Sequence, residues 1–183
     1  MASEDMATDA RANISIRRLT RDDAPIFHSF RLAMLAAAPT AFTSTPEEER
    51  DRSIESIEDQ IAPRDRPNHF ILGAFDAEGR LLGIAGLTVP ARRQERHKGT
   101  LFGMGVAPEA TGLGIGHALV TYLFQEARKI EGLLQIALTV TEGNARAEQL
   151  YRTFGFEVFG REIRAVLADG HPITKLHMVC MLD

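Results

Sequence analysis

The 183-residue sequence is long enough for one compact domain with a sizeable core and short for two. Hydrophobic residues (44%) and charged residues (25%) occur in the proportions of a globular protein, which excludes a largely disordered chain, and a net charge of −4 excludes the basic surface of a nucleic-acid-binding protein. No apolar run reaches the roughly 18 to 20 residues of a membrane span, and the single cysteine, Cys180, excludes an intrachain disulfide and a cysteine metal cluster.

The N-terminal segment is acidic and rich in small residues, with neither the positive start nor the apolar stretch of a signal peptide. We interpret residues 1–12 as a flexible leader and residues 13–183 as the folded domain. With one cysteine and no paired histidine spacing for a metal, the composition predicts a cytoplasmic enzyme or binding domain with no nucleic acid, membrane or metal among its partners.

The first half of the chain predicts an edge strand, two helices and a hairpin of two strands. Pro25 suits the first turn of the first helix, and the acids Glu47, Glu48 and Glu49 lie at the positive end of the second helix, where we expect them to be solvated. In chain order these elements are strand 14–17, helix 22–38, helix 44–61, strand 69–75 and strand 80–89.

The second half alternates strands and helices before ending in two strands, and Cys180 is expected to be a buried thiol in the last of them. The whole order, β-α-α-β-β-β-α-β-α-β-β, predicts a single α/β domain with helices packed on a mixed sheet. The elements are strand 99–106, helix 114–131, strand 134–140, helix 144–154, and strands 156–163 and 174–182.

Three glycines at alternate positions, Gly112, Gly114 and Gly116, lead from the strand ending at Val106 into a helix. Glycines allow a ligand to approach the backbone closely, and a helix start offers unpaired N–H groups that suit a phosphate. A P-loop is excluded because His117 follows the last glycine in place of lysine, and the glycine spacing differs from a Rossmann fingerprint. A tight strand-to-helix turn without a ligand stays open on this evidence alone.

A second motif follows one strand later. Asn144 and Tyr151 are seven residues apart, two helical turns, and therefore face the same way. Asn144 also suits a helix N-cap, so a ligand contact and a capping role are both open. For Tyr151, a role at a ligand and a purely structural role, in which only its ring packs, are likewise both open.

In order and spacing these segments strongly resemble the GNAT superfamily of acyl-CoA-dependent N-acetyltransferases, over about residues 14–183. The matching motifs are Val106-x-Pro108, the glycine turn, Asn144-x-x-Ala147-x-x-Leu150-Tyr151 and Gly155-Phe156. The resemblance implies one N-acetyltransferase domain with a mixed, mostly antiparallel central sheet flanked by helices. It also implies transfer of an acetyl group from acetyl-CoA to a primary amine by direct attack in a ternary complex.

In the family, the pantetheine arm lies between the strands that end here at Val106 and Val140, and the turn binds the pyrophosphate. The family usually has arginine or glutamine at the position of Thr111. This difference puts a side-chain contact with the cofactor in doubt, whereas a contact through the Thr111 backbone N–H stays open. The resemblance assigns the cofactor to Met104, Gly105, Val106, Thr111, Gly112, Leu113, Gly114, Ile115, Gly116 and Asn144.

The resemblance assigns catalysis to the Val106 N–H, which polarises the thioester carbonyl, and to Tyr151, which meets the departing thiolate. A phenol with a pKa of about 10 transfers its proton uphill to a thiol with a pKa of about 8.5, so we expect Tyr151 to donate a hydrogen bond. The general base stays open between Glu95, His97 and water, because strand 99–106 lacks the glutamate that many members carry there.

The acceptor is not determined by the sequence: a small metabolite, an antibiotic amine, a protein N-terminus and a lysine are all open. So are a homodimer and another acyl donor, such as succinyl-CoA or propionyl-CoA. The alternative from another class is a non-catalytic acyl-CoA-binding or regulatory module, which would keep the glycine turn and tolerate loss of Tyr151.

Overall fold

The computed structural model describes residues 14–182. The expected leader, residues 1–12, lies outside the described residues. Seven strands form one sheet in the order β1-β2-β3-β4-β5-β7-β6. Neighbouring strands are antiparallel except β4 and β5, which are parallel, so the sheet is mixed and mostly antiparallel, as expected. The strands are β1 Ser15–Arg18, β2 His69–Phe75, β3 Leu81–Thr88, β4 Lys98–Val106, β5 Gln135–Thr141, β6 Glu157–Ala168 and β7 His171–Met181.

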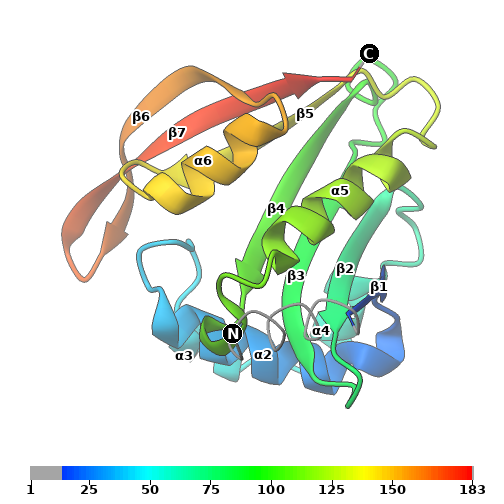
Figure 1. The fold of residues 1–183 in the computed structure, drawn as a ribbon, viewed down its shortest axis with the longest axis vertical. Coiled ribbons are helices and arrows are strands. Elements are labelled where there is room, and N and C mark those ends of the chain that lie inside the picture. The colour runs from blue at the N-terminus through cyan, green and yellow to red at the C-terminus, as the bar shows by residue number, and fades with distance from the viewer. Residues whose placement is uncertain (1–13, 183) are drawn as a thin grey trace, which may run out of the picture.

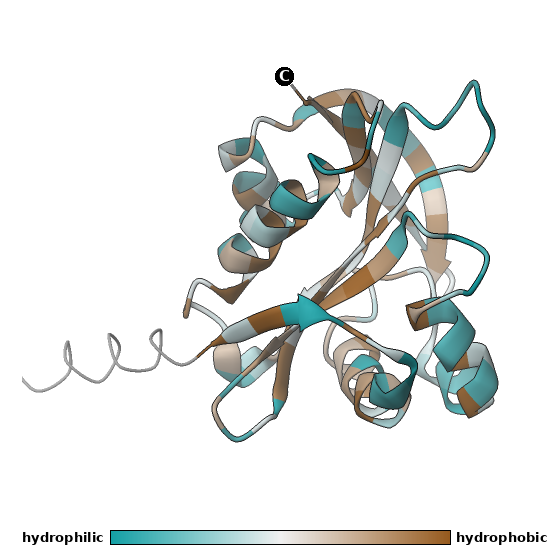
Figure 2. Ribbon diagram, turned by 90° about the vertical axis from the view of Figure 1, so that its right-hand side faces the viewer, coloured by the Kyte–Doolittle hydropathy of each residue, from teal (hydrophilic) through white to brown (hydrophobic). Residues whose placement is uncertain are grey.

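Helices cover both faces of the sheet (Figure 1, Figure 2). Helices α5 and α6 lie on one face, and α2 to α4 lie on the other, below β2 to β4. Buried side chains such as Phe27, Ile57, Leu72, Leu119 and Ile136 fill the space between these layers. The helices are α2 Ala24–Ala37, α3 Pro46–Arg50, α4 Ile54–Ile61, α5 Ile115–Ala127 and α6 Ala145–Thr153, with short 3-10 turns at Arg21–Asp23 and Pro108–Ala110.

The helix predicted over residues 44–61 is two helices, so that prediction was wrong. Thr45 begins α3 with a capping box that includes Glu48. Ser53 then accepts a hydrogen bond from the Ser56 N–H and starts α4 afresh. Because each cap satisfies the free N–H groups of its own helix start, residues 51–53 form a corner between two short helices.

Other boundaries differ at the ends of elements. Helix α5 ends at Ala127, earlier than the predicted residue 131. Strands β6 and β7 run several residues further than predicted and meet at the expected turn, where Asp169 and Gly170 have φ of 50° and 78°.

Strand β4 leaves its neighbour β5 early. The two strands pair only from Lys98 to Thr100, opposite Gln135 to Ala137. Beyond that point the β4–β3 register shifts, and Gly103 has φ of 61°, a conformation that favours glycine. The bulge bends β4 away from β5, and Figure 1 shows the two strands diverging. The divergence leaves one backbone edge of β4 without a neighbouring strand.

A buried ion pair fixes α3 against α2. Glu49 is 2% exposed, and its carboxylate lies 3.0 Å from Arg31 Nε on α2 and 3.4 Å from Arg52 Nη1. The Glu49 carbonyl oxygen also lies 2.8 Å from His28 Nε2. The expectation that all three acids of this segment are solvated was therefore wrong for Glu49. The consequence is a fixed path for the chain between α2 and α3.

We expect Glu49→Ala to lower the free energy of unfolding by about 3 kcal/mol, because the largely buried Arg31 guanidinium loses its carboxylate partner and keeps only the hydrogen bond to Ser44. For a domain of this size the melting temperature falls by about 6–12 °C. Glu47→Ala is the matched control, because Glu47 is exposed on the same helix, and we expect a change within about 0.5 kcal/mol. Equal melting temperatures for the two variants would contradict the role of Glu49.

Candidate active site

A cavity of about 580 Å³ lies where β4 and β5 diverge. It is bounded by the end of β4, the glycine turn, the start of α5, one side of α6 and the segment that follows α2. Of the residues predicted to bind the cofactor or to act on the thioester, Leu113 alone does not line it, and its side chain packs against the core. The predicted residues that the structure brings together here are Met104, Gly105, Val106, Thr111, Gly112, Gly114, Ile115, Gly116, Asn144 and Tyr151.

The glycine turn presents its backbone to the cavity. Gly112 and Gly114 have φ of 87° and 79°, and a Cβ at either position would point into open space. Gly116 lies inside α5, where a Cβ would come within 3.3 Å of Leu150 and Met104. The first two glycines therefore shape the turn and keep its mouth open, and the third allows α5 to pack closely on β4 and α6.

Four consecutive amides at the start of α5 are unpaired. Within residues 14–182, the N–H groups of Gly114, Ile115, Gly116 and His117 donate no hydrogen bond. These groups lie at the positive end of the dipole of a 13-residue helix. They form an arrangement that suits an anionic group such as a phosphate.

The polar side chains around the turn favour an anion too. His117 and Arg146 line the cavity, and no aspartate or glutamate is among its described lining residues. The Thr111 hydroxyl donates to the Ala107 carbonyl at 3.3 Å, so this side chain makes a local hydrogen bond within the loop. The sequence patterns did not single out His117 or Arg146. Each lies in the first turn of its helix next to a motif residue, so helical geometry could have predicted that both side chains lie near the ligand.

The open edge of β4 offers a backbone donor at its end. The Ala107 N–H donates to the Leu82 carbonyl beyond the end of β3, at 2.8 Å. Because successive N–H groups of a strand point to opposite sides, the Val106 N–H points to the side from which β5 has diverged. Val106 also lines the cavity. Its amide is therefore placed to meet a carbonyl oxygen bound there.

Tyr151 is 6% exposed and lines the cavity from α6. Its ring packs against Phe156, with ring centroids 5.7 Å apart. Burial raises the pKa of Tyr151 to about 12, so the phenol keeps its proton at neutral pH. Ring packing and a position at the cavity are thus both present, and the hydroxyl is suited to donate a hydrogen bond.

Asn144 caps α6, as one of its two predicted roles requires. Its side-chain oxygen accepts a hydrogen bond from the Ala147 N–H at 3.2 Å. Asn144 lines the cavity as well, and its amide nitrogen donates no hydrogen bond within the described chain. The cap fixes the oxygen and leaves the nitrogen for a ligand.

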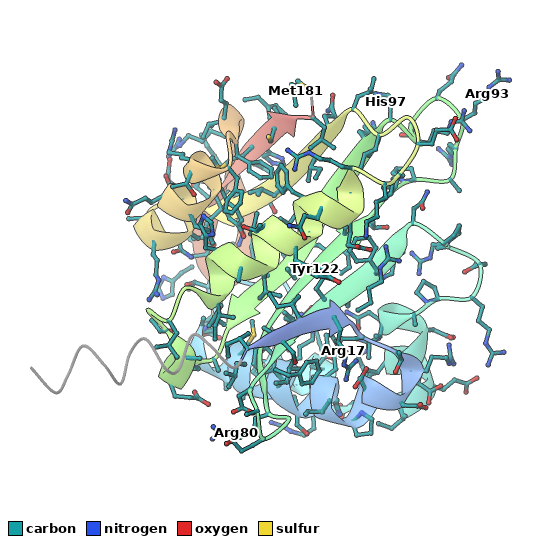
Figure 3. All side chains as sticks on the ribbon, turned by 45° about the vertical axis from the view of Figure 1, so that its right-hand side comes forward. Arg17, Arg80, Arg93, His97, Tyr122 and Met181 are labelled. Atoms are coloured by element: carbon teal, nitrogen blue, oxygen red, sulfur yellow. The ribbon has the colours of Figure 1, made fainter. Side chains whose placement is uncertain are left out.

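The two predicted base candidates, Glu95 and His97, do not line the cavity. They precede β4 at Lys98, whereas the cavity is formed by the end of that strand, on the order of 20 Å away. Glu95 lies 3.6 Å from Lys98 and 3.8 Å from Arg92. Figure 3 shows His97 beside the charged loop that carries Arg93, at the far end of the molecule. Neither side chain is placed to take a proton from a ligand in the cavity.

The segment after α2 forms the apolar wall of the cavity with Ala38, Ala41 and Phe42. Lys175 of β7 holds this segment in place. Its ammonium group is buried, with the residue 5% exposed, and donates to the Ala41 carbonyl at 3.1 Å and to the Thr141 hydroxyl at 2.7 Å. That hydroxyl donates in turn to the Thr40 carbonyl at 2.8 Å. Burial lowers the pKa of Lys175.

No group of His, Cys, Asp and Glu side chains within residues 14–182 is arranged to hold a metal ion. In the same part of the chain, no helix has the length and apolarity needed to cross a membrane.

Comparison with known proteins places this arrangement in a wider context. The model of the acetyltransferase (GNAT) family matches residues 32–156. A mycothiol acetyltransferase from Frankia casuarinae is 31% identical over 138 residues, which are 72% of this chain and 39% of that protein. One from Salinispora arenicola is 35% identical over 127 residues, 68% of this chain and 40% of that protein. The chain thus spans about two fifths of the length of these relatives.

Solved structures share the fold over nearly the whole chain. An acetyltransferase of the GNAT family from Streptococcus pneumoniae superimposes with a TM-score of 0.80 and 25% identity, covering 93% of this chain and 99% of that one. An acetyltransferase from Salmonella typhimurium, solved with acetyl-CoA, has a TM-score of 0.78 and 21% identity, with 93% and 95% covered.

The Lys175 tether can be tested by Lys175→Met, which keeps an apolar stem and removes the three donors. We expect a loss of about 1–3 kcal/mol of stability, because the Ala41 carbonyl loses its Lys175 donor, while the Thr40 carbonyl keeps the hydrogen bond from the Thr141 hydroxyl. Amide hydrogen exchange over residues 38–45 should accelerate while exchange over 111–116 stays unchanged. Lys98→Met, at a partly exposed lysine, is the control, and the tether is refuted if both variants exchange like the wild type.

Proposed function

Since this chain belongs to the acetyltransferase (GNAT) family, we propose that it transfers an acetyl group from acetyl-CoA to a primary amine by direct attack in a ternary complex. Residues 13–183 form the N-acetyltransferase domain in this proposal. The observation that carries it is that unpaired helix amides, an open strand edge and a protonated tyrosine surround one cavity. The matched relatives are much longer than this chain, so its acceptor does not follow from theirs.

The donor binds along two backbone surfaces. The pyrophosphate accepts hydrogen bonds from the amides of residues 114–117, and His117 and Arg146 add donors where the family's usual side chain is replaced by Thr111. The pantetheine amides pair with the free edge of Met104–Val106, as an added strand would. From α6, the side-chain nitrogen of Asn144 donates a hydrogen bond to the bound acetyl-CoA.

The reaction forms a C–N bond and breaks a C–S bond. The neutral amine attacks the thioester carbonyl carbon, and the charge that develops on its oxygen is stabilised by the Val106 N–H. The thiolate then departs with the bonding electrons. Proton transfer from a phenol of pKa about 12 to a thiol of pKa about 8.5 is uphill by about 5 kcal/mol. Tyr151 therefore stabilises the thiolate with a hydrogen bond and retains its proton.

The attacking amine must lose a proton, since an ammonium has no lone pair. With no carboxylate among the described lining residues and with Glu95 and His97 at the far end of β4, we assign this proton to water. The acceptor lies against the apolar wall formed by Ala38, Ala41 and Phe42. A small molecule and a protein amine both fit this description. A cytoplasmic location stays a prediction from composition.

The donor site can be tested by thermal melting with CoA. At about 100 times its dissociation constant, CoA adds about 2.7 kcal/mol, which raises the melting temperature by about 5–10 °C. We expect Gly114→Ala to diminish this rise, because the new methyl group projects into the mouth of the turn. Gly79→Ala is the matched control: Gly79 has the same φ of 79°, also with open space around its Cβ, in the β2–β3 turn.

Both substitutions introduce a similar backbone strain of about 1–2 kcal/mol, so we expect the two variants to differ only in the rise of melting temperature that CoA causes. No rise with CoA in the wild type, or an equal rise in both variants, would count against the proposed site. Thiol release from acetyl-CoA on addition of primary amines distinguishes an enzyme from a non-catalytic binding module.

The role of Tyr151 can be tested by Tyr151→Phe. We expect kcat to fall by roughly 10- to 100-fold, because a hydrogen bond to a charged group contributes about 1.5–3 kcal/mol. The CoA-dependent rise in melting temperature should persist. Because the Tyr151 phenol keeps its proton below its pKa of about 12, the pH dependence of kcat should have the same shape in both proteins between about pH 6 and 10.

Tyr122→Phe serves as the control, since Tyr122 lies on α5 and does not line the cavity (Figure 3). A wild-type kcat for the Tyr151 variant would remove that hydroxyl from the mechanism.

A further inference from the structure

Two residues of α2 extend the apolar wall formed by Ala38, Ala41 and Phe42. Met34 and Ala37 line the same cavity, so this side of it is built from apolar side chains on α2 and on the segment that follows. Met34 is buried, whereas Ala37 is exposed at the end of the helix. The wall therefore runs from the interior of the cavity to its outer rim.

The interior end of this wall lies beside the proposed reacting centre. A Cβ at Gly105 would collide with the Met34 methyl group and would lie 3.5 Å from Phe42 Cζ. Both side chains therefore cover the β4 backbone at the residue before Val106, whose N–H is proposed to meet the thioester oxygen. An amine that attacks a carbonyl bound there has apolar surface next to it.

The charges around the cavity provide no counter-ion for a cationic group of the acceptor. Among the described lining residues the one fixed charge is that of Arg146, which is positive. Behind the wall, Lys175 donates to the carbonyls of Thr40 and Ala41, and it pairs with no carboxylate within residues 14–182. A cation that loses its water in this cavity would stay unpaired, which is strongly unfavourable.

The acidic residues that follow the wall in the sequence are engaged or lie elsewhere. Glu49 is buried in its ion pairs with α2 and with Arg52, and Glu48 belongs to the capping box of α3. Neither of them, nor the exposed Glu47, lines the cavity. The run of three acids therefore does not serve as a binding site for a cationic acceptor.

We propose that the acceptor is a primary amine with an apolar body and no second positive charge, such as an alkylamine or an arylalkylamine. This inference rests on the proposed function and names the substrate class of the same site. The apolar body of such an amine leaves water on binding against the wall, which is favourable. Polyamines and amines with further basic groups are disfavoured by the unpaired charge.

Two amines of equal chain length test this class in the wild-type protein. In 1,4-diaminobutane an ammonium group replaces the terminal methyl group of pentylamine. We expect thiol release from acetyl-CoA to give a kcat/KM that is at least roughly 10-fold higher for pentylamine. The reason is that its methyl group gains by burial against the wall, whereas the ammonium group loses its water without gaining a partner.

Ala37→Glu introduces a carboxylate at the rim of the wall, at an exposed position of α2. We expect kcat/KM for 1,4-diaminobutane relative to pentylamine to rise by about 3- to 10-fold, because the second ammonium group gains a partly exposed partner. Ala36→Glu is the matched control, since Ala36 is the exposed neighbour on the same helix and does not line the cavity. Its ratio should stay within about 2-fold of the wild type.

Melting curves with and without CoA verify that each variant is folded and binds the donor. Equal or faster turnover of 1,4-diaminobutane in the wild type, turnover of neither amine, or the same ratio in the two variants would each overturn the inference. The proposed function would still stand in those cases. It fails only if CoA causes no rise in melting temperature or if no primary amine releases thiol from acetyl-CoA, and the inference then fails with it.

Discussion

The early separation of β4 from β5 is the constraint on which the rest of the site depends. A parallel strand in the middle of a sheet normally has both edges satisfied by neighbours. Here the pairing stops at Thr100, and the bulge at Gly103 turns the remainder of β4 away. The sheet gives up several ladder hydrogen bonds at this point and gains a backbone edge that an extended ligand with amide groups can complete. The same separation opens the volume that becomes the cavity.

The electrostatics of the cavity follow from elements that meet at its rim. The start of α5 directs four unpaired amides inward, and His117 and Arg146 add donors from two helices. No carboxylate of the described residues lines the cavity, and Glu126 and Glu142 pair with Arg18 and Arg161 outside it. A site of this kind favours an anionic donor and offers no fixed base. Because no carboxylate lines the cavity, the proposed chemistry assigns the proton of the amine to water.

The apolar wall of the cavity formed by Ala38, Ala41 and Phe42 is held from two sides. Glu49, on the helix that follows the wall, pairs with Arg31 on the helix that precedes it. Lys175 anchors the wall directly through the carbonyls of Thr40 and Ala41. Both anchors are charged side chains of buried residues, and removing the partner of a buried charge is strongly destabilising. A wall built from small and apolar residues has few polar groups of its own to define its position, so these two tethers supply that definition.

Apart from the break between α3 and α4, the sequence by itself determined the order of elements, the turn at Gly112 and Gly114, and the cap at Asn144, because periodicity, glycine and capping act over a few residues. Only the tertiary structure decided which distant segments meet. It separated β4 from β5, buried Glu49, directed His117 and Arg146 to the cavity and left Glu95 and His97 at the other end of β4. These outcomes depend on strand pairing and on packing between segments far apart in the chain, and no local pattern in a single sequence encodes them.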